Sequence, residues 1–377
     1  MHVPDSLPIC GNMPVWTPEQ DNALNAVARW LESPGGAQVF RLFGYAGTGK
    51  STLALHLAEH VDGDVAFAAF TGKAALVMRS KGCKDARTIH SLIYRATDTE
   101  TEEPSFVLND ESDAAHAKLI VIDECSMVDE ELGRDLLSFG KKVLVLGDPA
   151  QLPPVSGGGF FTEAEPDVML TEVHRQASDN PIIRLSMTIR EGGALARGVY
   201  GETRIVGRSE LDPALVTGAD QVLVGRNKTR RAYNGRLREL RGITGVFPQS
   251  GEKLVCLRNN RKKGLLNGAL FTVKSAGALR KGKIRMLVMP EEGETGKFQR
   301  VAVIPQFFEG GEGEIPYALR KDSDEFDFGY ALTVHKAQGS QWDNVTLFDE
   351  SFAFREHRAR WLYTGVTRAA QKLTLVM

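Results

Sequence analysis

The sequence predicts an α/β protein of two domains with parallel sheets, in which a small β-barrel interrupts the second domain. In the first half of the chain, short apolar runs alternate with helical patterns, which is typical of parallel strands joined by crossover helices. Between residues 246 and 308 the pattern changes to short β-like segments, and after residue 330 the α/β alternation returns. A length of 377 residues suits two domains with an inserted module.

Each expected strand rests on a short apolar run. In the first half these runs lie at residues 39–43, 65–70, 119–122 and 143–146. A further run at 221–224 precedes a basic helical pattern at 228–240. The barrel is expected from segments at 253–257, 270–273, 284–288 and 301–304, which Gly, Asn and Lys turns separate. The second domain then resumes at 330–334, 345–347 and 373–376.

The composition excludes several classes of protein. Hydrophobic residues make up 42% of the chain and charged residues 25%, which are ordinary globular values, and no apolar run is long enough to cross a bilayer. Residues 1–16 have neither the basic nor the apolar region of a secretion signal, so we expect a cytoplasmic protein. The four cysteines lie far apart, which argues against a zinc site or disulfides and predicts reduced thiols.

The net charge of −2 implies that any contact with nucleic acid is local. Basic residues gather at 226–241 and at 258–263, whereas the segment 291–327 is rich in acidic residues. A solvated helix face is the simpler explanation of the basic groups, and a nucleic-acid contact is the alternative.

A phosphate-binding loop is predicted at residues 44–51, which read Gly-Tyr-Ala-Gly-Thr-Gly-Lys-Ser and fit the P-loop pattern. An apolar run precedes the loop and a helical pattern to about residue 60 follows it, as a P-loop requires. Backbone amides at a helix start can surround phosphates, Lys50 can reach the β- and γ-phosphate oxygens, and the Ser51 hydroxyl can bind Mg²⁺. The expected nucleotide contacts in this loop are Gly44, Ala46, Gly47, Thr48, Gly49, Lys50, Ser51 and Thr52.

Two carboxylates follow the apolar run at 119–122. Asp123 is expected to hold Mg²⁺ through its water shell, and Glu124 to orient or deprotonate the attacking water. An isolated Asp-Glu pair is more often a solvated strand end, but the upstream P-loop favours the catalytic interpretation. Because a nucleotide switch does not need a group that handles water, Glu124 favours hydrolysis over passive nucleotide binding.

Gln20 has two interpretations. Together with Thr17 and Pro18 it fits a capping box before a helical pattern that runs to residue 31, and in that interpretation its role is purely structural. Alternatively, its amide reads the adenine edge of a nucleotide. The spacing alone does not decide between the two.

Taken together, these residues resemble the superfamily 1B helicases of the RecD and Dda type. The resemblance rests on seven motifs that follow the P-loop in the family's order and extend the match over residues 17–370. They read Phe-Thr-Gly-Lys-Ala-Ala from residue 70, Thr-Ile-His from 88, Asp-Glu-Cys-Ser-Met from 123, Gly-Asp-Pro-Ala-Gln-Leu-Pro-Pro-Val from 147, Leu-Thr-Glu-Val-His-Arg-Gln from 170, Thr-Val-His-Lys-Ala-Gln-Gly-Ser from 333 and Tyr-Thr-Gly-Val-Thr-Arg-Ala from 363.

The resemblance implies two RecA-like P-loop domains that hold ATP and Mg²⁺ between them. The first is expected at 1–170, and the second at 171–245 together with 326–377. The catalytic groups that the resemblance implies are Lys50, Asp123, Glu124, Gln151, Arg175 and Arg368, with Ser51 and Asp123 at the metal. Both arginines would stabilise charge on the γ-phosphate, and a surface salt bridge is the alternative for each. Gly339 and Gln341 are further nucleotide contacts, although many relatives carry Glu where Gln341 stands, so its ribose or nucleotide contact stays open.

The resemblance also implies that single-stranded nucleic acid crosses both domains. The residues expected to touch it are Thr71, Lys73, Thr88, His90, Thr333, His335 and Lys336. Taken singly, each of the two histidines is more often structural. ATP would close the cleft and hydrolysis would open it, which gives an inchworm motor. Residues 151–154 resemble the branch that moves 5′ to 3′.

Two inserts are implied as well. Residues 94–117 stand where related helicases carry a pin that splits the duplex, and Phe106 is the candidate to meet the terminal base pair, with a polar surface loop as the alternative. Residues 246–325 resemble an SH3-like module, which would hold the strand or a partner protein.

The expected function is an ATP-dependent DNA helicase that acts on single-stranded DNA and on junctions with duplex, in a bacterial cell or a phage-infected host. A single-strand-binding protein and replisome or recombination proteins are open as partners. No membrane is involved, and we expect a monomer because one chain completes the ATP site. The rivals are an RNA helicase, a translocase that does not unwind, and, from another class, a nucleotide-gated binding switch.

Overall fold

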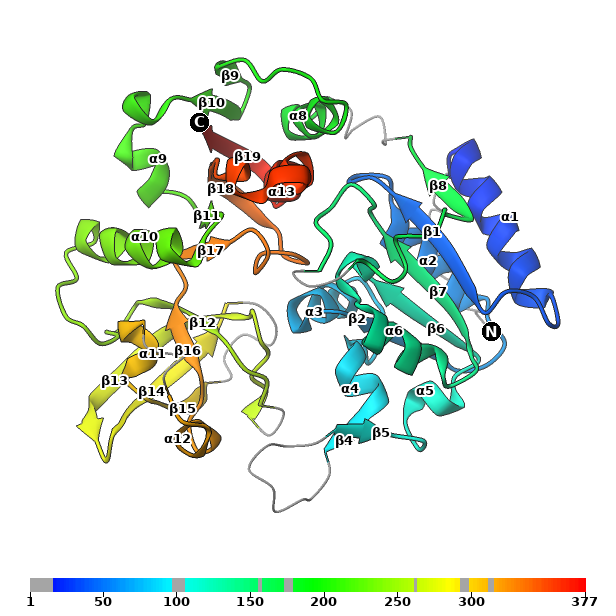
Figure 1. Cartoon of the computed structure of the whole chain (residues 1–377), viewed down its shortest axis with the longest axis horizontal. Helices are drawn as coiled ribbons and strands as arrows, with labels where there is room; N and C mark the ends of the chain where they lie inside the picture. Colours follow the sequence, from blue (N-terminus) through cyan, green and yellow to red (C-terminus); the bar gives the residue numbers. More distant parts are fainter. Residues whose placement is uncertain are drawn as a thin grey trace, which may run out of the picture.

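The computed structural model describes residues 16–96, 106–154, 158–172, 179–260, 263–291, 298–310 and 315–377. Figure 1 shows two sheets with helices on their faces, and a third sheet below the second. The two large sheets confirm the α/β class with parallel strands that the sequence predicts.

The first sheet has the strand order β3-β2-β6-β7-β1-β8, and all its neighbours run parallel. Its strands are β1 (Val39–Gly44), β2 (Val65–Ala69), β3 (Arg87–Thr88), β6 (Leu119–Asp123), β7 (Lys142–Gly147) and β8 (Val168–Leu170). The helices around it are α1 (Pro18–Glu32), α2 (Lys50–Glu59), α3 (Gly72–Ser80), α4 (Ile89–Ile93), α5 (Asp113–His116) and α6 (Glu130–Leu137). Apolar clusters fill both faces of this sheet, so its strands are near-continuously apolar, as buried parallel strands are.

The second sheet has the order β17-β11-β18-β19-β10-β9, and only β9 runs antiparallel to its neighbour. Its strands are β9 (Gly198–Tyr200), β10 (Thr203–Val206), β11 (Gln221–Val224), β17 (Ala331–Thr333), β18 (Trp342–Phe348) and β19 (Ala369–Val376). Its helical segments are α8 (Pro181–Arg190), η2 (Arg208–Glu210), α9 (Pro213–Thr217), α10 (Asn227–Leu240), η5 (Ser351–His357) and α13 (Arg358–Val366). The sequence did not predict β9 and β10.

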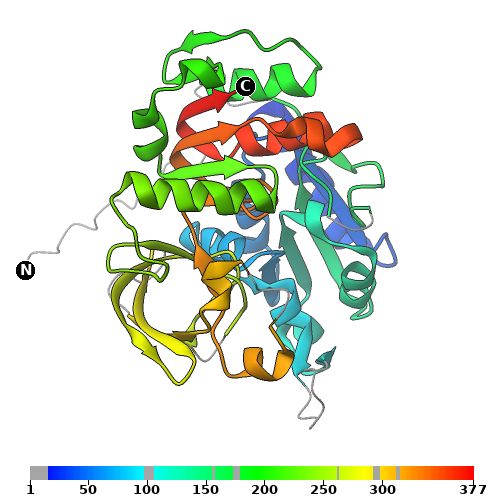
Figure 2. The ribbon, with the colours of Figure 1, turned by 60° about the vertical axis from the view of Figure 1, so that its left-hand side comes forward.

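The third sheet is antiparallel, with the order β15-β14-β13-β12-β16. It contains β12 (Lys253–Cys256), β13 (Leu270–Arg280), β14 (Lys283–Pro290), β15 (Gln299–Val303) and β16 (Phe326–Phe328), with α11 (Gln306–Glu309) and α12 (Tyr317–Lys321) beside them. In Figures 1 and 2 this insert lies below the second sheet and next to the first domain. The loop before β13 reaches α3, since a Cβ on Gly72 would come within 2.7 Å of the Leu266 Cβ.

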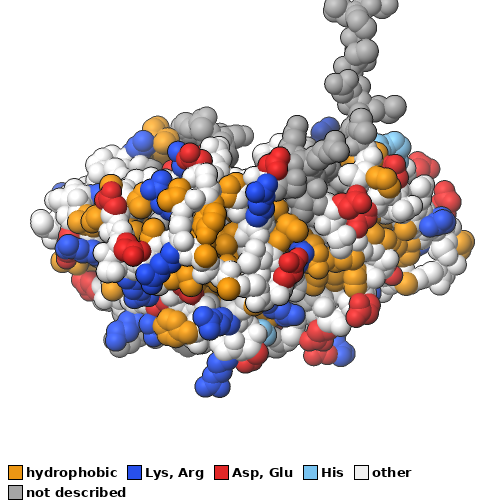
Figure 3. Space-filling view, turned by 90° about the horizontal axis from the view of Figure 1, so that it is seen from above, with side chains coloured by type: hydrophobic (Ala, Val, Ile, Leu, Met, Phe, Trp, Pro, Cys, Tyr) orange, Lys and Arg blue, Asp and Glu red, His pale blue; other side chains and the backbone are white. Residues whose placement is uncertain are grey.

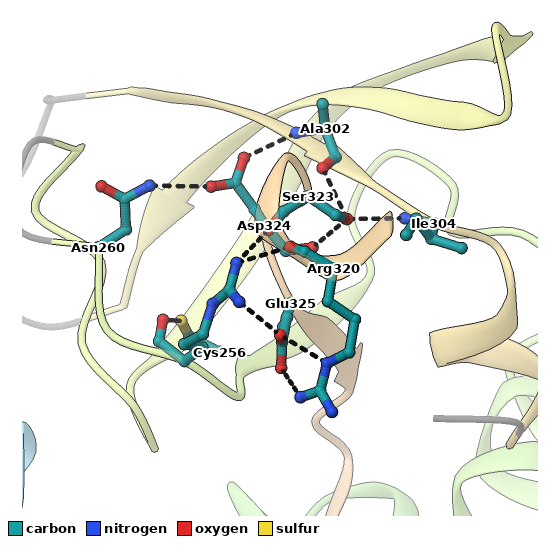
Figure 4. A network of polar contacts seen from close by, with 9 residues as sticks. Cys256, Asn260, Ala302, Ile304, Arg320, Ser323, Asp324 and Glu325 are labelled. Carbon is teal, nitrogen blue, oxygen red and sulfur yellow. Dashed lines mark hydrogen bonds and ion pairs between the residues drawn. The ribbon is translucent and has the colours of Figure 1, made fainter. Parts of the chain in front are cut away.

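Two buried carboxylates fix the loop that follows β12 (Figure 4). Asp324 accepts hydrogen bonds from the Ala302 amide at 2.9 Å and from the Asn260 side chain at 3.2 Å. Glu325 is paired with Arg258 at 3.0 Å and with Arg320 at 2.7 Å. Because unpaired buried charges are costly, these partners hold the loop and α12 in one arrangement.

The basic helix α10 is only partly the solvated face that its composition favours, because two of its arginines are buried. Arg230 and Arg238 are buried, with 2% and 7% of their surface exposed. Arg230 contacts Asp327 at 2.5 Å, and Arg238 contacts Glu252 at 2.6 Å, so the helix is clamped to the insert. The expectation of a solvated face is therefore wrong for these two residues.

The face of the molecule seen from above in Figure 3 has mixed charge. On the face shown in Figure 3, basic, acidic and apolar side chains lie interspersed. No helix in the described parts of the chain is both long and apolar enough to cross a membrane. Cys83, Cys125 and Cys256 are buried free thiols, and Cys10 lies outside the described residues.

Candidate nucleotide site and strand-binding surface

The P-loop lies between the carboxyl end of β1 and the start of α2, as its pattern predicts. Gly47 and Gly49 have φ values of 83° and 80°, which glycine adopts without steric cost. Gly44 is also required, because a Cβ there would lie 2.7 Å from the Thr48 hydroxyl. The Lys50 ammonium donates to the carbonyls of Gly44 at 2.6 Å and Tyr45 at 3.0 Å. These partners are exchangeable loop carbonyls, so the ammonium is held inside the loop that would receive phosphates.

Ser51 and Asp123 meet at the carboxyl edge of the sheet. The Ser51 hydroxyl donates to Asp123 Oδ2 at 2.9 Å, across 72 residues of sequence. A hydroxyl and a carboxylate are both hard oxygen ligands of the kind that Mg²⁺ prefers, so this pair fits a magnesium ion bound to phosphate. Thr52 follows in the first turn of α2.

Glu124 comes directly after β6 in a strained backbone conformation. Its φ of 55° and ψ of 46° are uncommon for a residue with a side chain. Its amide donates to Asp123 Oδ1 at 2.8 Å. Burial raises the pKa of Glu124, and the charges of Arg368 and Lys50 oppose this shift. A carboxyl with a raised pKa is suited to accept a proton, as a general base does.

Gln20 is buried, and both the oxygen and the nitrogen of its side-chain amide bond to the protein itself. Its side-chain oxygen accepts from the Thr17 amide at 3.0 Å, which completes the capping box of α1. Its amide nitrogen donates to the carbonyl of Thr48 in the P-loop at 3.1 Å. The side chain therefore links α1 to the phosphate loop as well as capping the helix.

Gln151 is placed by a turn after β7. Its amide donates to the Asp148 carbonyl at 3.0 Å, and the Asp148 carboxylate accepts from the Ala150 amide at 3.0 Å. Gln151 is 7% exposed, and its side-chain oxygen accepts no hydrogen bond from the described residues. A buried amide oxygen beside a P-loop can accept a hydrogen bond from a water or a nucleotide-bound group.

Helix α13 of the second domain reaches across to this turn. The Tyr363 hydroxyl donates to Asp148 Oδ2 at 2.6 Å and accepts from the Ala46 amide of the P-loop at 3.1 Å. The next residue, Thr364, accepts from the Leu152 amide at 3.0 Å. Sequence reasoning assigned no role to Tyr363 or Asp148, because 215 residues separate them and only the fold brings them together.

Gln338 adds a third bond across the domains, since its side chain donates to the Leu152 carbonyl at 3.0 Å. Leu152 is 1% exposed and belongs to the apolar cluster of the second sheet. The turn that carries Gln151 is thus anchored in the second domain.

Arg368 follows α13 and is 5% exposed. All three of its guanidinium nitrogens are engaged within the second domain: Nε donates to Thr364 O at 3.0 Å, Nη1 to Ser340 O at 3.2 Å and Nη2 to Thr367 Oγ1 at 3.2 Å. Its charge influences the pKa values of Glu124 and Asp148, which places it close to the catalytic carboxylates. Arg175 lies outside the described residues.

Arg190 is a contact that the sequence did not reveal. Its guanidinium lies 3.5 Å from the centre of the Tyr45 ring, so the end of α8 stacks on the P-loop. The sequence provided little indication of this contact, because Tyr45 occupies a variable position of the P-loop pattern and Arg190 lies in no motif.

Gly339 and Gln341 are placed differently from each other. Gly339 packs against the first domain, where a Cβ would lie 2.9 Å from the Thr71 hydroxyl and from the Ala74 Cβ. Gln341 is exposed and lines a cavity of about 460 Å³ with Asp220, Lys253, Glu291, Trp342, Asp343 and Ala370. No P-loop residue lines that cavity.

The strand residues predicted in the first domain are mainly helix caps and buried groups. The Thr71 hydroxyl accepts from the Ala74 amide at 3.1 Å, and the Thr88 hydroxyl from the Ser91 amide at 3.2 Å. Lys73 is 3% exposed, and its ammonium lies 4.2 Å from the centre of the Trp342 ring. His90 is exposed and lies beside Tyr94, with ring centres 5.7 Å apart.

The strand residues predicted in the second domain lie together at the carboxyl end of β17. Thr333 accepts from the Lys336 amide at 3.3 Å, and His335 contacts Phe354 with ring centres 5.3 Å apart. Burial and the charge of His357 lower the pKa of His335, so its imidazole is mainly neutral near pH 7.

Phe106 stands on a short hairpin. Strands β4 (Tyr94–Ala96) and β5 (Phe106–Leu108) pair antiparallel, with Ala96 opposite Phe106, and residues 97–105 lie outside the described residues. The Phe106 side chain is 63% exposed.

Comparison with models of known protein families identifies the family to which the chain belongs. A model described as an AAA domain matches residues 16–207, and one described as a UvrD-like helicase C-terminal domain matches 328–376. The chain belongs to the superfamily 1B helicases. The two matched segments carry the P-loop and the Arg368 motif, which are the two sides of the site described above.

Two curated relatives agree with this assignment. The chain is similar to the ATP-dependent RecD2 DNA helicase of Deinococcus radiodurans, with 30% identity over 91% of this chain and 47% of that protein. It is also similar to the ATP-dependent DNA helicase dda of Enterobacteria phage T4, with 30% identity over 50% of this chain and 48% of the relative. The chain thus spans about half the length of the curated relatives it matches.

Solved structures share the fold. The crystal structure of Bacteroides Pif1 bound to ssDNA covers 96% of this chain and 92% of its own, with a TM-score of 0.58 and 19% identity. Pif1 helicase from Candida albicans gives a TM-score of 0.58 and 18% identity over 97% of this chain and 94% of its own.

Proposed function

We propose that this chain is an ATP-dependent DNA helicase that moves 5′ to 3′ on single-stranded DNA and separates duplex DNA. The observation that carries the proposal is the set of hydrogen bonds between the two domains at the nucleotide site. Tyr363 contacts both the P-loop and Asp148, and Thr364 contacts the turn that carries Gln151. A nucleotide that enters this site acts on both domains at once, so its hydrolysis can move one domain against the other.

The chemistry follows from the residues present. Lys50 and the loop amides would bind the phosphates, and Ser51 and Asp123 would hold Mg²⁺, which would neutralise phosphate charge. Glu124 takes the proton of the attacking water while Gln151 orients that water. Arg368 exchanges a backbone carbonyl of its own domain for a γ-phosphate oxygen, and Arg175 is its proposed companion. Gln20, Gly339 and Gln341 are proposed to contact the nucleoside.

The strand is proposed to cross both domains through the predicted motif residues. Relatives support DNA as the track, because both curated relatives are named DNA helicases and the Bacteroides Pif1 structure contains ssDNA. The residues proposed to contact it are Thr71, Thr88 and His90 from the first domain, Thr333, His335 and Lys336 from the second, and Lys73 when the cleft opens. We expect a monomer, in which the segment 246–325 is an SH3-like module and 94–117 is the pin.

The test combines ATPase and strand-separation assays. ATP hydrolysis is measured alone, with single-stranded DNA and with RNA, and unwinding is measured on duplexes that bear a 5′ or a 3′ tail. Lys50→Ala is the inactive control. We expect many-fold stimulation by DNA and unwinding from the 5′ tail. Unwinding from the 3′ tail overturns the proposed polarity. Stimulation by RNA but not by DNA overturns DNA as the nucleic acid on which the protein moves. An ATPase rate that nucleic acid does not change favours the nucleotide-gated binding switch.

The pin has its own test. Phe106→Ala is expected to slow strand separation while translocation on single-stranded DNA continues at the wild-type rate. The matched control is Phe298→Ala, because Phe298 is also an exposed phenylalanine, 51% against 63%, but lies in the insert. Full unwinding by Phe106→Ala rejects the role.

A further inference from the structure

One exposed aromatic ring lies at the carboxyl edge of the second sheet, outside every motif that the sequence singled out. Phe352, in η5, has 60% of its surface exposed. Its neighbour Phe354 is turned inward and stacks on Trp361, with ring centres 5.4 Å apart and an angle of 13°. Two phenylalanines of one short segment therefore have opposite environments, and only the inner one serves the core.

Phe352 lies beside the segments that carry the predicted strand contacts. Strands β11 and β17 pair in parallel with Val224 opposite Thr333, and the Val334 amide donates to the Val224 carbonyl at 3.0 Å. The Gly225 amide, just after β11, donates to Glu350 Oε2 at 2.7 Å. The ends of β11, β17 and β18 are thus side by side, and His335 contacts Phe354 from the same edge.

A buried carboxylate makes this edge rigid. Glu350 is 2% exposed and accepts hydrogen bonds from the amides of Gly225 and Arg226, from the Thr229 hydroxyl at 2.7 Å, and from Nε and Nη2 of Arg226 at 3.0 and 2.8 Å. Although burial alone would raise its pKa, the donors from Thr229 and Arg226 hold the pKa of Glu350 below its usual value. Its charge is therefore balanced within the protein.

Arg226 lies between the Glu350 carboxylate and the Phe352 ring. Its guanidinium lies 5.7 Å from the centre of Phe352, and its side chain stays 56% exposed although Glu350 fixes it. Holding a long side chain in one geometry lowers the entropy lost when a ligand binds. The exposed face thus presents an aromatic ring and a guanidinium that is already ordered.

We propose that Phe352 is a stacking platform for one base of the single strand, and that Arg226, held by Glu350, positions the ring. This inference rests on the proposed function and adds a contact to the same track. A base stacks on an aromatic ring whatever its sequence, which suits a motor that moves along any strand. A strand that passes Thr333 and His335 at the end of β17 and continues along the same edge, past β11, meets Phe352 after the end of β18.

Equilibrium binding of a fluorescent oligothymidylate to the full chain tests the platform. Phe352→Ala is expected to weaken binding about tenfold, because one base–aromatic stack is lost. Phe352→Tyr is expected to bind as the wild type does, because it keeps the ring. Tyr200→Ala is the matched control and is expected to leave affinity unchanged, because Tyr200 is an exposed aromatic residue, at 43%, on the opposite edge strand β9 of the same sheet.

The salt dependence separates stacking from other losses. Each phosphate contact of a single strand contributes about 0.7 to the slope of log affinity against log salt concentration. Phe352→Ala is expected to keep the wild-type slope, since a ring neutralises no phosphate. If the alanine variant does not fold, Phe352→Leu carries the test, because leucine keeps an apolar side chain without a π-face.

The outcomes are distinct. If the wild type does not bind the oligonucleotide, the proposed function fails. If the wild type binds and Phe352→Ala or Phe352→Leu binds equally well, strand binding stands and the platform is overturned. Equal losses in Phe352→Ala and Tyr200→Ala also overturn the platform, because they show a general effect of removing surface rings.

Discussion

The P-loop and the segment around Thr71 both follow strands of the first sheet, yet they relate to their ligands in opposite ways. In the P-loop, Lys50 bonds to loop carbonyls that it can leave, and Ser51 already meets Asp123. In the second segment, Thr71 caps α3 and Lys73 is buried against Trp342. The nucleotide site is preformed, whereas this part of the strand surface is occupied by the protein itself.

The position of the strands does not explain the difference, because β1 and β2 are each next to an edge strand of the sheet. The difference lies in what covers the segment after the strand. The helix after β2 is covered by Leu266 of the insert at Gly72 and by the second domain at Gly339. A motif at a strand end can therefore serve a domain interface as well as a ligand, and the sequence does not distinguish the two.

The strongest test of the preformed site is Arg368→Ala. We expect single-turnover ATP hydrolysis to fall about 10³- to 10⁵-fold, because the variant loses an arginine that neutralises charge on the transferred phosphoryl group. The control is Arg360→Ala, an exposed arginine of α13, the helix that precedes Arg368. If hydrolysis persists near the wild-type rate, the guanidinium serves only its bonds to Thr364 and Ser340.

Glu124→Gln is expected to lower hydrolysis about 10²- to 10⁴-fold and to leave ATP binding intact, because the amide cannot take a proton from water. Rapid-quench hydrolysis and equilibrium nucleotide binding measure the two quantities separately. Glu130→Gln, at the exposed start of α6, is the matched control. A parallel loss of ATP binding would assign Glu124 to nucleotide affinity instead.

The pH profile sharpens this assignment. Burial raises the pKa of Glu124 above its ordinary value of 4.5. Because a base must be ionised, kcat/KM for ATP is expected to rise with pH through that raised value, and to begin falling on acidification earlier than an ordinary glutamate would cause. The neutral carboxyl is the form favoured by folding, so its contribution to stability is complete below pH 4.5 and declines as pH rises towards the folded pKa. In Glu124→Gln, the pH dependence of kcat/KM and the pH dependence of stability that Glu124 causes should both be absent.

Tyr363→Phe tests the contact between the domains and should have an intermediate effect. The ring is kept, but the Asp148 carboxylate and the Ala46 amide each lose a buried partner, and a hydrogen bond to a charged group contributes about 1.5–3 kcal/mol. We expect a lower Tm and about tenfold slower hydrolysis, measured by thermal unfolding and steady-state ATPase. Tyr233→Phe is the control, since its ring packs on Phe348 away from this site. Equal effects of the two variants would contradict a specific role of the Tyr363 hydroxyl in the contact between the domains.

The sequence predicted those features whose residues are contiguous. The P-loop, Asp123 and Glu124 each follow an apolar run, and the strand β11 lies at residues 221–224 as expected. It did not predict the Tyr363–Asp148 contact or the stack of Arg190 on Tyr45, because these depend on how two domains meet. A pattern of residue types also cannot show that Arg230 and Arg238 turn inward, since their acidic partners lie in the insert or beside it.

The smallest expected effect separates the two lysines of the strand motifs. Lys73→Met should lower the free energy of unfolding by about 0.5–2 kcal/mol, the usual range of a cation–π contact such as the one with Trp342. Its strand affinity should keep the wild-type salt slope, because a buried ammonium neutralises no phosphate. Lys336 is half-buried in the turn after β17, and Lys336→Met should instead reduce the slope by about 0.7. If Lys73→Met reduces the slope as well, the cleft opens when the strand binds, and the buried arrangement around Trp342 is one state of a moving interface.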